Sequence, residues 1–419
     1  MRIMAVFLLV LLVGCQTMLP LARDLRKESR TVVLSGVVES DYDANQVLVV
    51  ATAVGNDSTS EEAGREVVAF SRLSTTSAFA LLVPDSRYYW VTAFADLNGN
   101  GRWDSGEAGG EVGGEVGLWA APGNDFDFLE IALNERLEVV QGLAVAEMDS
   151  PPAAIRVRSG ELSTLDDPHL STEAGTQGLW QPLEFSQTIG FGIDFLEPFD
   201  PDRIALLFVN GAGGSPQDWR AAIENLDRSR FQPWLLVYPS GAPLGEMAGA
   251  TTSLLEALAQ KHGFQEVFLV AHSMGGLIAR AVADRLGSPE ARPSIRLLVT
   301  AATPFEGHSA ASQGVRYSPA VVPSWRDLEP GSDYLTQLAR TRLRSRLPHV
   351  VFFAFGGPTW RMSHNNDGTV TLPSQLPAWI QEDAASLRGF DRGHTGILTD
   401  PDMLKELGRV LREQQEALR

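Results

Sequence analysis

The sequence contains little cysteine, little histidine and no excess of positive charge. Among its 419 residues there is one cysteine, Cys15, so no disulfide can form within the chain. Its 7 histidines show no set with the spacing of metal ligands, which argues against a metallohydrolase. Lys and Arg number 34 against 52 Asp and Glu, and the net charge of −18 excludes nucleic acid as an expected partner. We interpret the acidity as a contribution to solubility.

The amino terminus also lacks an apolar run long enough to cross a membrane. Residues 3–13 are apolar, whereas a spanning helix needs about 20 such residues. A positive start, this short apolar run and Gly14 before Cys15 predict a secretory signal over residues 1–14.

The residues around Cys15 suggest a use for the lone cysteine. Leu12-Val13-Gly14-Cys15 resembles the bacterial lipobox, which implies cleavage before Cys15 and a diacylglycerol on its thiol. Gln16 follows, and by resemblance to enterobacterial sorting rules this implies the outer membrane. We therefore expect a lipid-anchored protein of the bacterial cell envelope, with residues 15–30 as a polar tether. A coincidental cysteine in an ordinary signal peptide is the alternative.

Residues 31–140 have the pattern of a small all-β module. Short runs rich in β-branched and aromatic residues alternate with clusters of Gly, Asn, Asp, Ser and Pro, which predicts a β-sandwich. The expected strands lie at residues 31–38, 46–54, 66–70, 78–83, 88–94, 126–131 and 137–140.

One loop of this module has the pattern of a calcium site. Oxygen-bearing side chains occupy positions 1, 3, 5, 9 and 12 of the segment 96–107, and Gly101 occupies position 6. The glycines that follow exclude an EF-hand helix, and the loop resembles calcium loops of bacterial cell-surface β-sandwich modules. We predict a structural Ca²⁺ site, with a metal-free acidic hairpin as the alternative. The ligands would be Asp96, Asn98, Asn100, Asp104 and Glu107.

Residues 141–184 are rich in small polar residues, and we predict that they form a linker. Residues 185–419 show a different pattern. Apolar runs alternate with helix-like segments, which predicts an α/β domain with a doubly wound, mostly parallel sheet. Ligand sites in such sheets lie at the carboxyl ends of the strands. We expect strands at 189–196, 204–209, 234–238, 267–270, 295–300, 350–355 and about 382–388, and helices at 248–262, 277–286 and 403–418.

Ser273 is the centre of this domain's pattern. It lies between an apolar run and a helix-like run, and small residues occupy the positions two before and two after it: Ala271 and Gly275. Strand and helix backbones nearly touch at such a turn, so only small residues leave room for them. The segment 269–276 therefore predicts a nucleophile elbow that presents the Ser273 hydroxyl.

Several further segments resemble the lipase and esterase type of α/β hydrolase. Residues 210–216 form a glycine-rich loop after a strand, similar to the His-Gly-x-Gly-Gly loop of bacterial lipases, with Asn210 in place of histidine. Residues 303–309 resemble the Thr-Pro-x-x-Gly-Ser stretch, and 367–370 resemble the family's acid loop. The resemblance covers residues 185–419. It implies oxyanion donors at the backbone N–H groups of Ala212 and Met274.

A hydrolase of this type needs a base and an acid as well as the serine. His394 in its Gly-His-x-Gly context is the predicted base and Asp367 the predicted acid, in the chain order Ser, acid, His. His308 and His364 precede the acid and are the competing bases, and Asp383 and Asp391 are the competing acids. His272 is expected to be structural.

The expected activity is hydrolysis of a carboxylic ester, on an ester or lipid substrate and without a catalytic cofactor. A thioesterase, an amidase or an acyltransferase would use the same residues. The non-enzymatic alternative is a surface-binding lipoprotein that has a hydrolase scaffold and no catalytic activity. Residues 306–347 interrupt the strand rhythm and predict a cap. Its apolar residues could line an acyl pocket or pack against the core: Tyr317, Val321, Val322, Trp325, Leu328, Tyr334 and Leu335.

Overall fold

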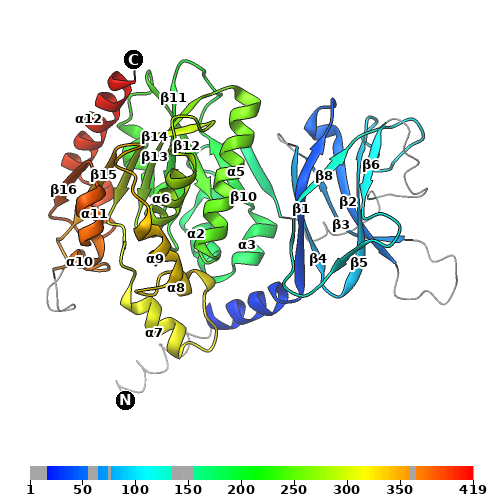
Figure 1. The fold of residues 1–419 in the computed structure, drawn as a ribbon, viewed down its shortest axis with the longest axis horizontal. Coiled ribbons are helices and arrows are strands. Elements are labelled where there is room, and N and C mark those ends of the chain that lie inside the picture. The colour runs from blue at the N-terminus through cyan, green and yellow to red at the C-terminus, as the bar shows by residue number, and fades with distance from the viewer. Residues whose placement is uncertain are drawn as a thin grey trace. The chain divides into compact units, whose positions relative to one another are not determined.

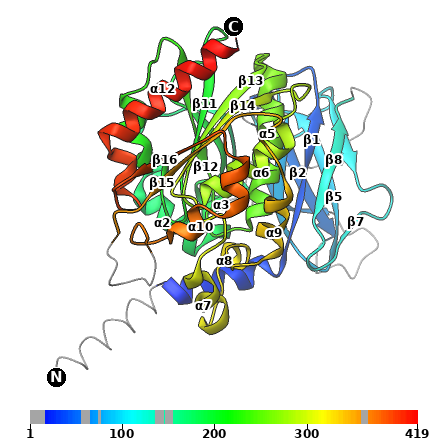
Figure 2. The same cartoon turned by 60° about the vertical axis from the view of Figure 1, so that its left-hand side comes forward.

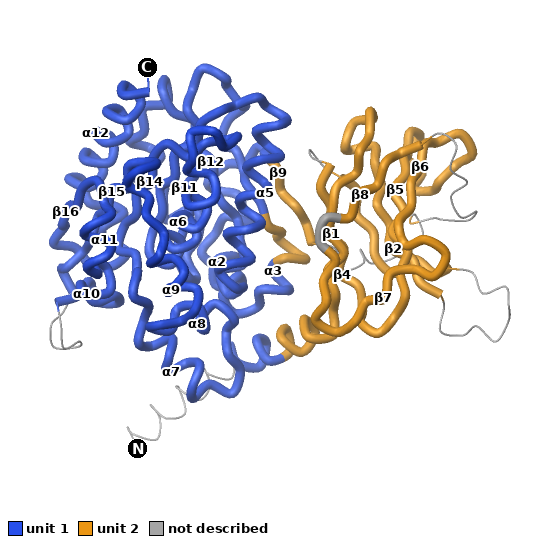
Figure 3. Tube along the Cα trace, viewed as in Figure 1, with its two compact units in different colours: residues 1–22, 160–185, 192–419 blue, residues 23–159, 186–191 orange. Residues whose placement is uncertain are grey.

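The computed structural model of the protein describes residues 17–54, 65–73, 77–134, 145, 155–357 and 365–418. The chain divides into two compact units, which Figure 3 shows in different colours. One unit contains Met1–Ala22, Gly160–Phe185 and Gly192–Arg419, and the other contains Arg23–Ser159 and Ser186–Phe191. In the part of the chain that is described, no helix has the length and apolarity needed to cross a membrane.

The smaller unit is rich in strands, and its strands form two sheets (Figure 1). One sheet has the order β4-β1-β8, and the other has the order β3-β2-β5-β6, with β7 paired to β5. The strands are β1 Thr31–Glu39, β2 Val47–Val54, β3 Arg65–Arg72, β4 Ala78–Pro84, β5 Arg87–Ala95, β6 Gly109–Val112, β7 Leu118–Ala120 and β8 Phe126–Ala132, with the short helix η1 at Ala44–Gln46.

These strands form because alternate side chains enter a shared apolar core. Val32 and Leu34 of β1, Leu81 of β4 and Val49 of β2 are all fully buried in one cluster that draws on both sheets. Six of the predicted strands of this unit correspond to β1, β2, β3, β4, β5 and β8. The strand predicted at residues 137–140 lies outside the described residues.

An eight-stranded sheet with the order β16-β15-β14-β13-β11-β12-β10-β9 forms the centre of the larger unit, which contains all of it except residues 157–159 of β9 and Phe191 of β10. Strands β11 to β16 pair in parallel, and β10 pairs antiparallel to β12. This is the predicted doubly wound, mostly parallel sheet. Its strands are β9 Val157–Leu162, β10 Phe191–Phe195, β11 Ile204–Val209, β12 Phe231–Val237, β13 Glu266–His272, β14 Ser294–Ala301, β15 His349–Ala354 and β16 Ser386–Phe390.

Helices cover both faces of this sheet, with α12 on one face and α5 and α6 on the other (Figures 1 and 2). The central strands are therefore buried on both sides, which explains why β11 and β13 read as continuous apolar runs. The helices are α2 Thr172–Trp180, α3 Pro182–Thr188, α4 Arg220–Glu224, α5 Leu244–His262, α6 Gly275–Leu286, α7 Ser309–Tyr317, α8 Pro323–Asp327, α9 Asp333–Arg340, α10 Leu372–Gln375, α11 Ala378–Asp383 and α12 Pro401–Ala417, with short helices η2 Pro168–Leu170, η3 Pro216–Trp219 and η4 Gly396–Thr399.

Two segments differ from their sequence-based predictions. Residues 17–28, expected within a polar tether, are helical, and Leu21 is fully buried there. The predicted linker at 141–184 contains β9, η2 and α2. Its small polar residues act locally: the Ser171 hydroxyl caps α2 by accepting from the Ala174 N–H, while Leu170 provides a buried anchor. β9 is instead an edge strand of the eight-stranded sheet, so strand pairing supplies its backbone hydrogen bonds.

Candidate active site

Ser273 stands at a sharp turn between β13 and α6. Its φ angle is +53°, a left-handed conformation that is costly for a residue with a side chain. The turn is crowded: a Cβ atom on Gly275 would lie 2.2 Å from the Asn210 carbonyl oxygen, and one on Gly276 would lie 2.0 Å from the Thr303 hydroxyl. Gly275 is therefore required by the close approach of the Asn210 backbone and Gly276 by the Thr303 side chain, as the crowding of an elbow demands.

The carboxyl ends of β13, β15 and β16 bring three predicted residues together. The Ser273 Oγ lies 2.9 Å from His394 Nε2, and His394 Nδ1 lies 2.7 Å from Asp367 Oδ2. Because Nδ1 faces a carboxylate, it carries the proton, and Nε2 is left as the acceptor for the serine O–H. The Asp367 side chain is fully buried, whereas 12% of the His394 side chain is exposed.

The backbone of the acid loop fixes Asp367. Its Oδ1 accepts from the N–H groups of Thr369 at 2.9 Å and Val370 at 2.6 Å, and its carbonyl accepts from the His394 N–H at 2.8 Å. These N–H groups hold the carboxylate in one orientation. Loop, acid and histidine therefore form one hydrogen-bonded unit.

The glycine-rich loop after β11 lies directly beside the serine. A Cβ atom on Gly211 would stand 2.8 Å from the Ser273 Cβ, so only glycine fits there. The Asn210 amide donates to the Gly214 carbonyl at 2.8 Å, which holds the loop closed from within. Within the described residues, neither the Ala212 N–H nor the Met274 N–H donates to any protein group. Both predicted oxyanion donors are thus unengaged.

The histidine next to the nucleophile, which is expected to be structural, contacts the backbone of the proposed base. The His272 Nε2–H donates to the His394 carbonyl at 2.8 Å, and the two rings lie 4.8 Å apart. Burial, with a smaller effect of the neighbouring His394, lowers the pKa of His272 to about 3. His272 is therefore neutral at physiological pH, and it supports the backbone that carries His394.

This shifted pKa predicts an acid-sensitive stability. His272 titrates near 6.5 when unfolded and near 3 when folded, so between these values the unfolded chain binds more protons and stability falls as the pH falls. One such group contributes a slope of up to about 1.4 kcal/mol per pH unit. We expect His272→Gln to reduce the slope by about that amount, measured by urea unfolding from pH 7 to pH 4. An unchanged slope would show that His272 is accessible to protons in the folded state. Burial also lowers the pKa of His349. His349 is present in both the original protein and His272→Gln, so its contribution to the slope is the same in the two.

The competing candidates have other partners. The His308 Nε2 lies 2.6 Å from the Thr369 carbonyl oxygen, and its Nδ1 accepts from the Ala310 N–H, which caps α7. Asp383 is bound to the buried Arg280 guanidinium at 2.7 Å. Asp391 is exposed, and His364 lies outside the described residues. Among the predicted acids and bases that the structure describes, His394 contacts Ser273 and Asp367 contacts His394.

The cap predicted at 306–347 contains α7, α8 and α9. Val322, Leu328 and Leu335 are buried, and Trp325 packs edge-on against Trp180 at 5.6 Å between ring centres. The Tyr317 side chain is 73% exposed. Most of these residues therefore pack within the unit.

The predicted calcium loop is closed by its own hydrogen bonds. Asp104 Oδ2 accepts from the amides of Asn98 at 2.7 Å and Asn100 at 2.8 Å, while Glu107 accepts from the N–H groups of Leu97 and Asp104. Asp96 is paired with Arg72. Across the described ranges, no group of three His, Cys, Asp or Glu side chains is placed to hold a metal ion. Calcium binding by this loop remains a prediction.

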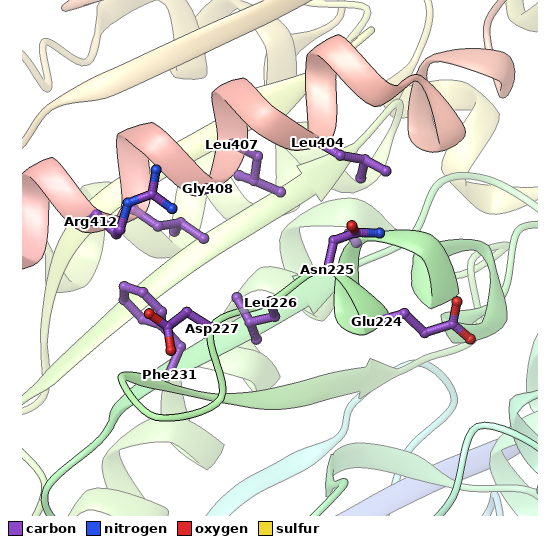
Figure 4. Close-up of a pocket in the computed structure, with 11 residues that line it drawn as sticks. Glu224, Asn225, Leu226, Asp227, Phe231, Leu404, Leu407, Gly408 and Arg412 are labelled. Carbon is purple, nitrogen blue, oxygen red and sulfur yellow. The ribbon is translucent and has the colours of Figure 1, made fainter.

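A hollow of about 340 Å³ lies away from these residues, between α12 and the segment that leads from α4 to β12 (Figure 4). Leucines and charged side chains line it together, including Leu404, Leu407, Asp227 and Arg412. None of the predicted site residues lines it. It is therefore separate from the Ser273 site.

Comparisons with known proteins agree with this architecture. Residues 206–410 match the model of the Alpha/beta hydrolase family, and this part of the chain has the α/β-hydrolase fold. No protein of curated function matches the sequence.

Similar solved structures include lipases and esterases. The mature lipase BlEst2 of Bacillus licheniformis is 17% identical, with a TM-score of 0.42, over 52% of this chain and 97% of that one. A metagenomic carboxyl esterase, MGS0156, is 15% identical, with a TM-score of 0.39, over 52% and 77%. A putative aryl esterase from Burkholderia cenocepacia is 13% identical, with a TM-score of 0.39, over 55% and 97%.

Proposed function

We propose that the protein is a serine hydrolase that cleaves carboxylic esters at the bacterial cell envelope. The observation that carries the proposal is the continuous hydrogen-bonded chain from Asp367 through His394 to a strained Ser273. A serine hydroxyl is a weak nucleophile by itself, and the imidazole nitrogen 2.9 Å from it is placed to accept its proton.

The residues have distinct roles in this mechanism. Ser273 Oγ attacks the ester carbonyl while its proton moves to His394 Nε2. Asp367 holds the ring with Nε2 toward the serine and stabilises the imidazolium that forms. The imidazolium then gives its proton to the departing alcohol, and a water molecule repeats the sequence to release the acid.

The free N–H groups of Ala212 and Met274 support this chemistry. The attacked carbonyl oxygen becomes an oxyanion, and donors already in position stabilise it without reorganising. Removal of one such donor costs about 3–4 kcal/mol in other serine hydrolases. The Asn210 and Ser240 side chains stiffen the loop that presents Ala212, since Ser240 Oγ accepts from the Gly213 N–H at 2.9 Å.

Esters are the proposed substrates because the elbow, the glycine-rich loop and the acid loop together resemble the lipase and esterase type. The envelope location is supported by the signal-like residues 1–14 and by Cys15 in its lipobox-like context. A diacylglycerol on Cys15 would hold the enzyme beside lipid esters of the membrane.

A fluorophosphonate probe tests the activity and the location together. It would be applied to membrane and soluble fractions of cells that express the full chain, followed by mass spectrometry of the labelled peptide and by assays on p-nitrophenyl esters of increasing chain length. We expect the membrane fraction to contain the protein with an adduct at Ser273, and we expect the labelled protein to have lost its ester turnover. No adduct would contradict the serine hydrolase, and an adduct without ester turnover would favour amide or thioester substrates. Label confined to the soluble fraction would contradict the anchor.

A further inference from the structure

A buried glutamine lies behind the proposed acid. Gln375, the last residue of α10, is fully buried. Its Oε1 accepts from the Ala354 N–H at 2.9 Å, and its Nε2 donates to the Ala354 carbonyl at 2.9 Å. The amide thus pairs with the last residue of β15 as a neighbouring strand would. Because Oε1 must face an N–H group, the orientation of the amide is fixed.

The fixed orientation directs a donor toward Asp367. The Gln375 Nε2 lies 3.2 Å from Asp367 Oδ2 and 3.3 Å from the Val370 carbonyl oxygen. Oδ2 is also the oxygen that accepts from His394 Nδ1. The carboxylate of Asp367 is therefore surrounded by four donors, two on each oxygen: Thr369 N–H, Val370 N–H, His394 Nδ1–H and Gln375 Nε2–H.

We propose that Gln375 is a positioning residue for catalysis, which fixes the Asp367 carboxylate so that Oδ2 stays in line with His394. The inference rests on the proposed function, because it assigns Gln375 a role in that same site. The two backbone donors hold only Oδ1, so rotation of the carboxylate about this oxygen would move Oδ2 away from the ring. Gln375 opposes that rotation from inside the protein, where its side chain is fully buried.

A purely structural role makes a different prediction. If Gln375 served only to complete the edge of β15 at Ala354, its loss would lower stability without acting through Asp367. Removing a buried amide that makes these bonds is destabilising in either case. The test must therefore separate kcat, KM and the dependence on Asp367 from stability.

The primary variant is Gln375→Met, which keeps the length of the side chain and removes the donor. We expect kcat to fall about 10- to 100-fold, the range for loss of a hydrogen bond to a charged group, with KM nearly unchanged. The control is Ser374→Ala, on the same helix, which removes a buried bond to the Gly307 carbonyl and touches no residue of the site. Its kcat should stay within about twofold of the original protein.

A second variant, Gln375→Glu, keeps the test valid if Gln375→Met does not fold. A carboxyl oxygen can still accept from the Ala354 N–H, and a protonated Glu side chain can still donate to Asp367. Ionisation of the new carboxyl at higher pH would instead place a like charge beside Asp367. We therefore expect near-normal activity at the acid end of the profile and an alkaline loss that the original protein lacks.

The Asp367→Asn background decides whether Gln375 acts through the acid. In that background Gln375→Met should lower kcat less than threefold, because Asp367→Asn has already altered the contact between Gln375 and residue 367. An equal loss in both backgrounds would overturn the proposal. So would a Gln375→Met kcat within twofold of the original protein together with an unaltered pH profile for Gln375→Glu.

One readout does not need turnover. The proton between His394 Nδ1 and Asp367 Oδ2 can be followed by its low-field NMR signal in the free protein. We expect Gln375→Met to shift or broaden this signal and Ser374→Ala to leave it unchanged; an unchanged signal in Gln375→Met would overturn the positioning role. Suppose that the NMR signal changes in Gln375→Met and not in Ser374→Ala, but that the original protein turns over no ester. The positioning of Asp367 would then stand, and the proposed substrate class would be wrong.

Discussion

Ser273→Ala is expected to lower kcat for ester hydrolysis by about 10⁶-fold, the loss measured when other serine hydrolases lose their nucleophile. The Ser273 Oγ is the atom within reach of His394 Nε2, and no other described hydroxyl contacts that nitrogen. Alanine keeps a Cβ atom at the turn with φ +53°, so the strained backbone is retained and the fold should not change.

The measurement is the initial rate on a p-nitrophenyl ester at saturating concentration, beside thermal unfolding of both proteins. Ser345→Ala is a matched control, because Ser345 is exposed and belongs to none of the elements around the site. Its rate should equal that of the original protein. A Ser273→Ala protein that retained more than about one thousandth of the original rate would show that another group is the nucleophile.

Asp367→Asn is expected to reduce kcat by about 10⁴-fold while the protein remains folded, as the same change does in other serine hydrolases with this triad. All four groups around the carboxylate are donors. An asparagine amide offers an acceptor on one side only. If its oxygen faces the N–H groups of Thr369 and Val370, its NH₂ group faces His394. The imidazole must then place its proton on Nε2, where it can no longer accept from Ser273.

The pH dependence of kcat distinguishes this change from simple misfolding. The variant should keep a folded near-ultraviolet circular dichroism spectrum and should recover part of its rate at alkaline pH, where hydroxide can replace the lost base. Asp391→Asn is the control, since Asp391 is exposed and is one of the two competing acids, with Asp383. A large loss in Asp391→Asn and a small one in Asp367→Asn would reassign the acid.

Much of the architecture was predictable because periodicity and small-residue spacing are local properties. The apolar runs that became β11 and β13 are buried on both faces, and a strand in that environment needs no polar alternation. The elbow was predictable for a related reason. Gly275 and Gly276 leave space for Asn210 and Thr303, so the small residues in the sequence already indicate that the chain is crowded at Ser273.

The tether and linker predictions differ from the structure because they depended on composition. Residues 17–28 look polar, yet Leu21 and Asp24 are buried and the segment is helical. Residues 157–180 have few apolar side chains, but β9 joins the edge of a sheet and Ser171 caps α2. Backbone pairing and capping do not require a strong apolar pattern, so composition alone does not reveal them.

The sequence by itself determined which residue types stand at the ends of the parallel strands: Ser273 after β13, Asp367 after β15 and His394 after β16. Tertiary structure alone decided that Oδ2 of the acid also meets Gln375, that His272 supports the His394 backbone, and that His308 caps α7 instead. The reason is physical. A strand order follows from hydrophobic periodicity and short connections, whereas a hydrogen bond depends on positions known to a few tenths of an ångström, which only the packed side chains fix.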